Sequence, residues 1–309
     1  MPSRRSGSPM PGSFPLFRLW GIQVSLHWSW AIVAYFQIQS RADVYDSPVW
    51  KVAEYLALFA IVLTHEFGHA LACRQVGGRA DHIVLWPLGG VAYVNPPARP
   101  GAWLWSIAAG PLVNVALVPI TVGVYLIANL AGLPDVSRDA NQFLFHLAAI
   151  NLVLLGFNLL PVYPLDGGQI LQSLLWFVIG RPRSLLVVSV IGLVVGLVVV
   201  VVALYYREGW FVILALFIAY QSYNGFRYAR HLAKLEAARR PDVACPACGF
   251  HPPAIDMWSC EQCGTRFDLF EHEGTCPTCH STYTVTACPE CHQSNPISNW
   301  YLAGPDRGW

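Results

Sequence analysis

Long apolar stretches, each near the length of a membrane-spanning helix, recur through the first 226 residues of this chain. A helix needs about 20 consecutive apolar residues to cross the hydrocarbon core of a bilayer. Stretches of this kind predict six spanning helices, at residues 20–39, 52–73, 103–130, 141–160, 184–206 and 210–226. A shorter apolar stretch, residues 169–180, predicts a partial or interfacial helix. The pattern therefore indicates an all-α polytopic membrane protein.

Residues 79–100 interrupt the helical pattern. Two β-prone runs, residues 83–85 and 91–94, flank Pro87-Leu88-Gly89-Gly90, which is typical of a short hairpin or a re-entrant loop. Non-helical backbone at membrane depth is tolerated where it is buried in protein or faces a water-filled cavity. An exposed strand edge there could pair with an extended peptide. An ordinary interfacial connector fits the same residues equally well.

Composition agrees with the membrane class and divides the chain in two. The chain is 55% hydrophobic and 12% charged, with a mean hydropathy of +0.44, which excludes an ordinary soluble domain. Residues 1–240 hold 17 Lys and Arg against 10 Asp and Glu, a net charge of +7. Residues 241–309 hold 2 against 8, a net charge of −6, together with eight of the nine cysteines. We therefore expect a membrane part followed by a separate cysteine-rich part.

A His-Glu-x-x-His pattern, residues 65–69, lies inside the apolar stretch 52–73. Residues four apart share one face of a helix, so His65 and His69 can bind the same metal ion, and Glu66 can take a proton from a water on that ion. The pattern also arises by chance in soluble helices. Ionisable groups within a membrane segment are costly, however, and their presence there favours a functional role.

A third metal ligand is expected from the turn after residues 141–160. Pro161 and Pro164 end that helix, and Gly167-Gly168 permits a turn that aims the Asp166 carboxylate back at the bundle. The distribution of Lys and Arg predicts that both termini are cytosolic, so that the histidines and Asp166 reach one depth in the cytosolic half of the bilayer. Two histidines and one carboxylate leave a position open for water, which is typical of catalytic zinc.

Several segments together resemble the site-2 protease family of intramembrane zinc metalloproteases. They are residues 65–69, 88–90, 110–114 (Gly-Pro-Leu-Val-Asn), 158–161 (Asn-Leu-Leu-Pro) and 165–168 (Leu-Asp-Gly-Gly). The resemblance extends from about Leu19 to Tyr228 and is greatest to the bacterial branch that contains the stage IV sporulation protease. It implies a zinc ion bound by His65, His69 and Asp166, with Glu66 activating water for attack on a transmembrane or membrane-proximal peptide. It also implies that Asn114, Gly89 and Gly90 lie near the bound substrate.

The cysteine-rich part contains four Cys-x-x-Cys pairs, which predict two structural zinc sites of four cysteines each, as in a double zinc ribbon. A cytosolic location keeps such thiols reduced. The simplest pairing joins neighbours, with Cys245, Cys248, Cys260 and Cys263 in one site and Cys276, Cys279, Cys288 and Cys291 in the other; a cross-braced pairing is not excluded. His280 and His292 are alternative ligands. The acidic charge argues against nucleic-acid binding and favours a protein-interaction module or a passive appendage.

These features predict a disordered N-terminus at residues 1–18, a metalloprotease domain at 19–228 and a basic juxtamembrane helix or linker at 229–240. A double zinc ribbon at 241–295 and a tail at 296–309 complete the expected order. We expect an integral membrane endopeptidase with one catalytic and two structural zinc ions. Its expected partners are a membrane-tethered protein substrate, the lipid bilayer and a regulatory protein at the ribbons. Two alternatives are a catalytically silent scaffold that acts through the ribbons and a metal transporter, which would need polar residues along several spans.

Overall fold

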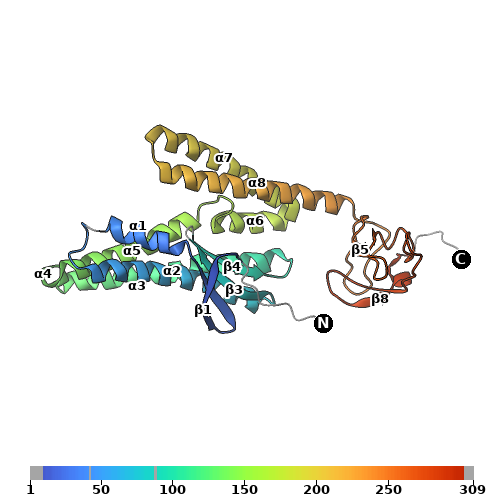
Figure 1. Cartoon of the computed structure of the whole chain (residues 1–309), viewed down its shortest axis with the longest axis horizontal. Helices are drawn as coiled ribbons and strands as arrows, with labels where there is room; N and C mark the ends of the chain where they lie inside the picture. The colour runs from blue at the N-terminus through green and yellow to red at the C-terminus, as the bar shows by residue number, and fades with distance from the viewer. Residues whose placement is uncertain (1–9, 42, 87–88, 303–309) are drawn as a thin grey trace. The chain divides into compact units, whose positions relative to one another are not determined.

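The structure is a computed structural model that describes residues 10–41, 43–86 and 89–302 (Figure 1). The chain forms two compact units, Met1–Phe226 and Arg227–Trp309.

Long apolar helices dominate the first unit. Among the described residues, four helices are long and apolar enough to cross a membrane. They are α2 (Pro48–Gln75), α3 (Pro100–Leu130), α5 (Arg138–Asn158) and α7 (Arg181–Tyr206). These helices confirm four of the six predicted spans. A single short turn, α4 (Leu133–Val136), joins α3 to α5.

The predicted first span, residues 20–39, is wrong. The chain there forms strand β2 (Ile22–His27) and helix α1 (Trp30–Ser40), whose 11 residues rise only about 16 Å. Strand β1 (Ser13–Leu19) also replaces part of the N-terminus that was expected to be disordered, while residues 1–9 lie outside the described residues. The reason is the alternation of apolar and polar residues from 22 to 27, a strand pattern that hydropathy averaging conceals.

Strands β3 (Arg79–Trp86) and β4 (Gly89–Asn95) pair antiparallel, which confirms the predicted hairpin; Pro87 and Leu88 lie outside the described residues. Together with β1 and β2 they form the sheet of the first unit, in the order β1-β2-β3-β4. Strand β2 pairs parallel with β3, with Val24 opposite Ile83. These apolar residues form one buried cluster with Phe67 and Ala70 of α2. The sheet is therefore packed against the half of α2 that carries the histidines.

A buried carboxylate fixes the opposite half of α2. Glu54, which is 1% exposed, accepts hydrogen bonds from Arg41 Nε at 2.7 Å and from Tyr45 Oη at 2.6 Å. His146 Nδ1 of α5 lies 3.1 Å from Oε2 of the same carboxylate. Burial, followed by the hydrogen bond to Glu54, raises the pKa of Tyr45. The polar loop before α2 is thereby tied to both α2 and α5.

Two further helices follow the membrane core. The short predicted helix is α6 (Asp166–Ile179). Helix α8 (Gly209–Ala237) is continuous and contains both the predicted sixth span and most of the basic segment, and it is not among the four helices described above. Six spans were predicted from the sequence, whereas four helices in the described residues are long and apolar enough to cross a membrane.

The second unit is small and poor in regular structure. It contains the hairpins β5 (Trp258–Ser259) with β6 (Arg266–Phe267) and β7 (Val285–Ala287) with β8 (Ser294–Pro296), and a 3-10 turn η1 (Ile297–Trp300). Its core joins Phe267, Phe270 and Trp300 to cysteine side chains. So small a core suits a unit that metal ions cross-link.

Candidate metal centre

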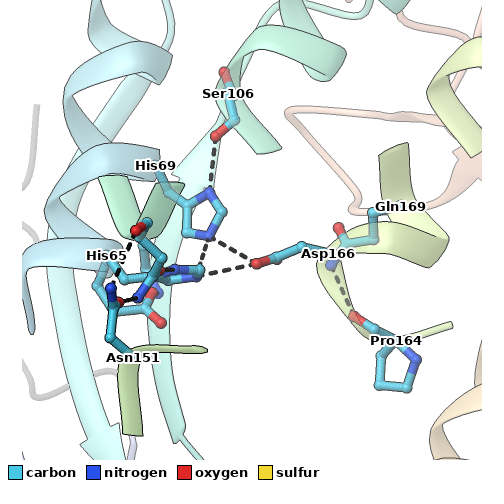
Figure 2. Close-up of polar contacts among 10 residues, drawn as sticks. His65, His69, Ser106, Asn151, Pro164, Asp166 and Gln169 are labelled. Atoms are coloured by element: carbon cyan, nitrogen blue, oxygen red, sulfur yellow. Dashed lines mark hydrogen bonds and ion pairs between the residues drawn. The ribbon is translucent and has the colours of Figure 1, made fainter. Parts of the chain in front are cut away.

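Three side chains converge between α2 and the first turn of α6 (Figure 2). His65 Nε2 lies 3.0 Å from His69 Nε2 and 3.0 Å from Asp166 Oδ2, and His69 Nε2 lies 3.4 Å from that oxygen. The three ligand atoms all lie within 4.8 Å of one another. Both histidines are buried, at 6% and 5% exposed. The structure therefore brings together the three ligands that the sequence suggested.

Hydrogen bonds on the far side of each imidazole determine which nitrogen faces the centre. His65 Nδ1 lies 2.6 Å from Asn114 Oδ1, and His69 Nδ1 lies 2.9 Å from the carbonyl oxygen of Ser106. Both acceptors are oxygens without a proton, so each Nδ1 is the donor and carries the hydrogen. Each Nε2 is left with a lone pair directed at the other ligands, which is the form that binds a metal ion.

The Asp166 carboxylate is held at the end of a braced loop. Gln169 Nε2 donates to the Pro164 carbonyl at 2.9 Å, and Ser222 Oγ of α8 donates to the Tyr163 carbonyl at 2.7 Å. Within the described part of the chain, Asp166 Oδ2 is buried and has no hydrogen-bond partner besides its contacts with the two imidazoles. A buried, unpartnered carboxylate oxygen between two nitrogen lone pairs fits a bound cation.

Glu66 lies beside the three ligands and is held by strand β4. The side chain is 6% exposed, and its Oε2 accepts a hydrogen bond from the Ala92 backbone N–H at 2.8 Å. A Cβ at Gly90 would clash with the Glu66 side chain, so a larger residue there would have to displace Glu66 from its present position. One carboxylate oxygen is thus committed to the strand and Oε1 remains an acceptor.

A cavity of about 570 Å³ opens from this cluster, with the three ligands and Glu66 in its wall. Most of the remaining lining is apolar and includes Trp30, Trp86 and Phe217. The arrangement is a buried metal site with a carboxylate base beside it, facing a cavity large enough for a short peptide segment.

Two residues expected near the substrate, Asn114 and Gly90, lie in the wall of the same cavity. Asn114 is nevertheless 0% exposed, and its amide is occupied by His65 and by Asn151 of α5. Gly90 and Gly89 lie in β4, with Gly90 against Glu66. The sequence reasoning missed Asn151 and the Ser106 carbonyl. A lone asparagine within an apolar span was the available signal for Asn151, whereas a backbone carbonyl gives none.

The cysteines of the second unit form two clusters, but the predicted pairing of neighbours is wrong. The first pair joins the last (Cys245, Cys248, Cys288, Cys291), and the two middle pairs join each other (Cys260, Cys263, Cys276, Cys279). The two ends of this cysteine-rich part are brought together by pairing of Val243 with Tyr301 and by the hydrogen bond from Ala244 N to Trp300 O at 2.8 Å. The two outer cysteine pairs therefore form one cluster, and the two pairs between them in the sequence form the other.

Each cysteine pair is followed by a residue with left-handed backbone: Gly249, Gly264, His280 and His292, with φ of 70°, 73°, 59° and 60°. The two histidines thus occupy the turn position that glycine occupies in the other two pairs, and neither belongs to a cluster among the described residues.

A hydrogen bond from Tyr283 Oη, 3.2 Å from the sulfur, lowers the pKa of Cys260 to about 5. A low pKa favours the thiolate that zinc binds.

Comparisons with known proteins find similarity to zinc metalloproteases. The family model described as peptidase family M50 matches residues 53–136 and 123–203. Zinc metalloprotease MJ0392 of Methanocaldococcus jannaschii is 28% identical over 208 residues, which are 67% of this chain and 58% of that protein. Stage IV sporulation protein FB of Bacillus subtilis is 33% identical over 120 residues, 38% of each chain. The solved structure of the site-2 protease from M. jannaschii aligns with a TM-score of 0.51 at 27% identity, and covers 69% of this chain and 95% of that one. The chain spans about half the length of the curated relatives it matches.

Proposed function

Because this chain belongs to peptidase family M50, the site-2 protease family of zinc metalloproteases, we propose that it is an intramembrane zinc endopeptidase. It hydrolyses a peptide bond in or near a transmembrane segment of a membrane-tethered protein. The observation that carries the proposal is the buried Glu66 carboxylate beside the cluster of His65, His69 and Asp166, at the wall of one cavity.

Zinc would be held by the Nε2 atoms of His65 and His69 and by the Asp166 carboxylate. Three protein ligands leave a position open, as catalytic zinc sites do. Zinc at this position would polarise the scissile carbonyl and lower the pKa of a water molecule toward about 7.

Glu66 moves the protons. Ala92 N–H holds Oε2, so Oε1 is free to take a proton from the attacking water. The water oxygen bonds to the carbonyl carbon, the carbon–nitrogen bond breaks, and Glu66 returns the proton to the leaving nitrogen. The products are a carboxylic acid and an amine, and the carboxylate of Glu66 is regenerated.

The substrate would bind as an extended strand. Strand β4 is one of the two edge strands of the sheet and lies directly beside Glu66. An edge strand offers unpaired backbone groups to a peptide, and an extended peptide exposes carbonyls that a helix would keep hydrogen-bonded. Gly89 and Gly90, at the start of β4, would then lie close to the bound chain.

The orientation follows from positive charge. With α8 crossing the bilayer at residues 210–226 and no crossing before α2, ten Lys and Arg lie in segments on the side of the C-terminal end of α2, against seven on the other side (Arg4, Arg5, Arg18, Arg41, Lys51, Arg138 and Arg207). Because positive residues concentrate in cytosolic loops, we assign the C-terminus and the metal centre to the cytosolic side, the latter within the inner half of the bilayer. A cytosolic N-terminus would require the predicted crossing at residues 20–39, where the chain forms β2 and the short helix α1.

The test is Glu66→Gln, which keeps the shape of the side chain and removes the base. Purified protein in vesicles is incubated with a membrane-tethered test protein, and substrates are sought by comparing membrane protein fragments from cells with either form. We expect cleavage to be abolished with zinc content unchanged. The control is Glu208→Gln, an exposed carboxylate in the turn between α7 and α8. Undiminished cleavage by Glu66→Gln would reject the mechanism.

A second function, a scaffold that binds a partner through its cysteine clusters, is favoured by the separate second unit. In this view residues 241–295 form a double zinc ribbon with two structural zinc ions. Removing residues 241–309 distinguishes the two functions, because a scaffold would lose all function whereas a protease would keep basal cleavage.

A further inference from the structure

Asn151 lies on α5, away from the cavity wall, and is 0% exposed. It makes two hydrogen bonds to a single residue of α3: its Nδ2 donates to the Asn114 backbone carbonyl at 3.2 Å, and its Oδ1 accepts from Asn114 Nδ2 at 2.7 Å (Figure 2). A buried asparagine in a membrane helix often does no more than join two helices. Here the hydrogen bonds form a series that reaches the metal centre, because the Asn114 side chain is also hydrogen-bonded to His65.

The direction of every bond in this series follows from one backbone oxygen. The Asn114 carbonyl can only accept, so Asn151 must place its NH2 group there and its Oδ1 toward the Asn114 side chain. Asn114 must then donate Nδ2 to Asn151, which leaves its Oδ1 facing His65 Nδ1. An oxygen at that place requires the hydrogen of His65 to be on Nδ1, and Nε2 is free to bind a metal ion.

The two histidines differ in the kind of group that keeps the hydrogen on Nδ1. His69 Nδ1 bonds the Ser106 backbone carbonyl, whose direction the helix fixes. His65 Nδ1 bonds a side-chain amide, which presents either its oxygen or its NH2 group after a half rotation. With NH2 toward Nδ1, the hydrogen would move to Nε2 and occupy the lone pair that the metal needs. A second residue is therefore required to keep Asn114 from rotating.

We propose that Asn151 is a positioning residue for the metal centre: it fixes the Asn114 amide and thereby keeps His65 in the tautomer that binds zinc. The inference rests on the proposed zinc site and names a residue that, among the described residues, hydrogen-bonds none of the metal ligands and does not line the cavity. Partners that orient a ligating histidine typically contribute about 10- to 100-fold to metal affinity.

The test measures zinc retention by the full chain in detergent against a graded series of chelator concentrations, without substrate. Asn151→Leu has the same branching but neither hydrogen bond, and we expect its catalytic zinc to be released about 10- to 100-fold more easily. Asn151→Asp is neutral in this position, because burial disfavours the charged form of a carboxyl group. It can still donate to the Asn114 carbonyl and accept from Asn114 Nδ2, so we expect it to retain zinc nearly as the parent does.

This ranking separates orientation from packing, because a residue that only fills space would tolerate leucine at least as well as aspartic acid. The chain also supplies a matched control. Asn129 Nδ2 donates to Asn141 Oδ1 at 2.9 Å, an asparagine pair between the same two helices with no histidine attached. Asn141→Leu should therefore leave zinc retention unchanged.

A double-mutant cycle completes the test. If Asn151 acts through Asn114, Asn151→Leu should add nothing to the loss caused by Asn114→Leu. Where Asn151→Leu does not fold, as judged by thermal unfolding, Asn151→Ala carries the same expectation. Parental zinc retention by the Leu or Ala variant, equal losses in the Leu and Asp variants, or additive losses in the cycle would each overturn the proposal. Absence of cleavage by the parent chain would instead count against the protease, since zinc retention is measured without substrate.

Discussion

Gly110 of α3 gives the sharpest test of the metal centre. A Cβ built at this position would lie 2.8 Å from His65 Nε2 and still closer to His69 Nε2, the two nitrogen atoms that would hold a zinc ion. Gly110→Ala should therefore displace an imidazole. Forcing one extra carbon into a packed site costs about 1–3 kcal/mol, which corresponds to roughly 5- to 150-fold weaker zinc binding.

The same substitution should have the opposite effect on the helix itself. Alanine favours a helix interior over glycine by about 0.8–1 kcal/mol, so the zinc-free protein should not lose stability from this term. The matched control is Gly123→Ala on the same helix, where nothing lies within 4 Å of the added carbon. Gly123→Ala should stabilise the helix by this amount and bind zinc as the parent does.

Both variants are assayed by chelator competition for zinc and by thermal unfolding with and without the metal. We expect Gly110→Ala to lose most of the stabilisation that zinc confers and Gly123→Ala to lose none. Zinc binding by Gly110→Ala that equals the parent would refute the placement of the ion between the two Nε2 atoms.

Three further predictions concern the second unit. Metal analysis of the purified chain should find three zinc ions, and the count should fall to one when residues 241–309 are removed. Cys245→Ser and Cys288→Ser should release the same zinc ion, so that the double variant loses no more metal than either single variant; two ions lost would restore the pairing of neighbours. Tyr283→Phe removes the hydrogen bond that lowers the pKa of Cys260 to about 5, so protons should compete with zinc at a higher pH and acid titration should release that ion earlier than in the parent.

The sequence was most informative where one feature decided the structure locally. The apolar length of α2 and the four-residue spacing of His65 and His69 were enough to predict one face of a helix. Asp166 could be expected nearby because prolines and glycines around it force a turn. Strand β2 could not be predicted in the same way, since its parallel partner β3 lies more than 50 residues away and hydropathy averaging treats alternating and helical patterns alike.

The cysteine pairing failed for a related reason. Identical Cys-x-x-Cys spacings define four equivalent ligand pairs, and nothing in the spacing tells which pairs meet. The choice depends on contacts between the ends of the unit, such as Val243 with Tyr301, which are set by the folded chain. Only the presence of two four-cysteine clusters could be predicted from the sequence.

The metal centre depends as much on α3 as on the His-Glu-x-x-His helix. An unsatisfied polar group in hydrocarbon costs several kcal/mol, so each imidazole needs an acceptor for its second nitrogen, and α3 supplies both, through the Ser106 carbonyl and Asn114 Oδ1. Close approach of the two helices is possible because Gly68 faces the Ala109 backbone, where a Cβ would lie 2.7 Å from the carbonyl oxygen. A chain with the His-Glu-x-x-His residues but without a glycine contact and an amide acceptor on the facing helix would therefore lack a defined tautomer at its histidines, and the short motif alone would not build this site.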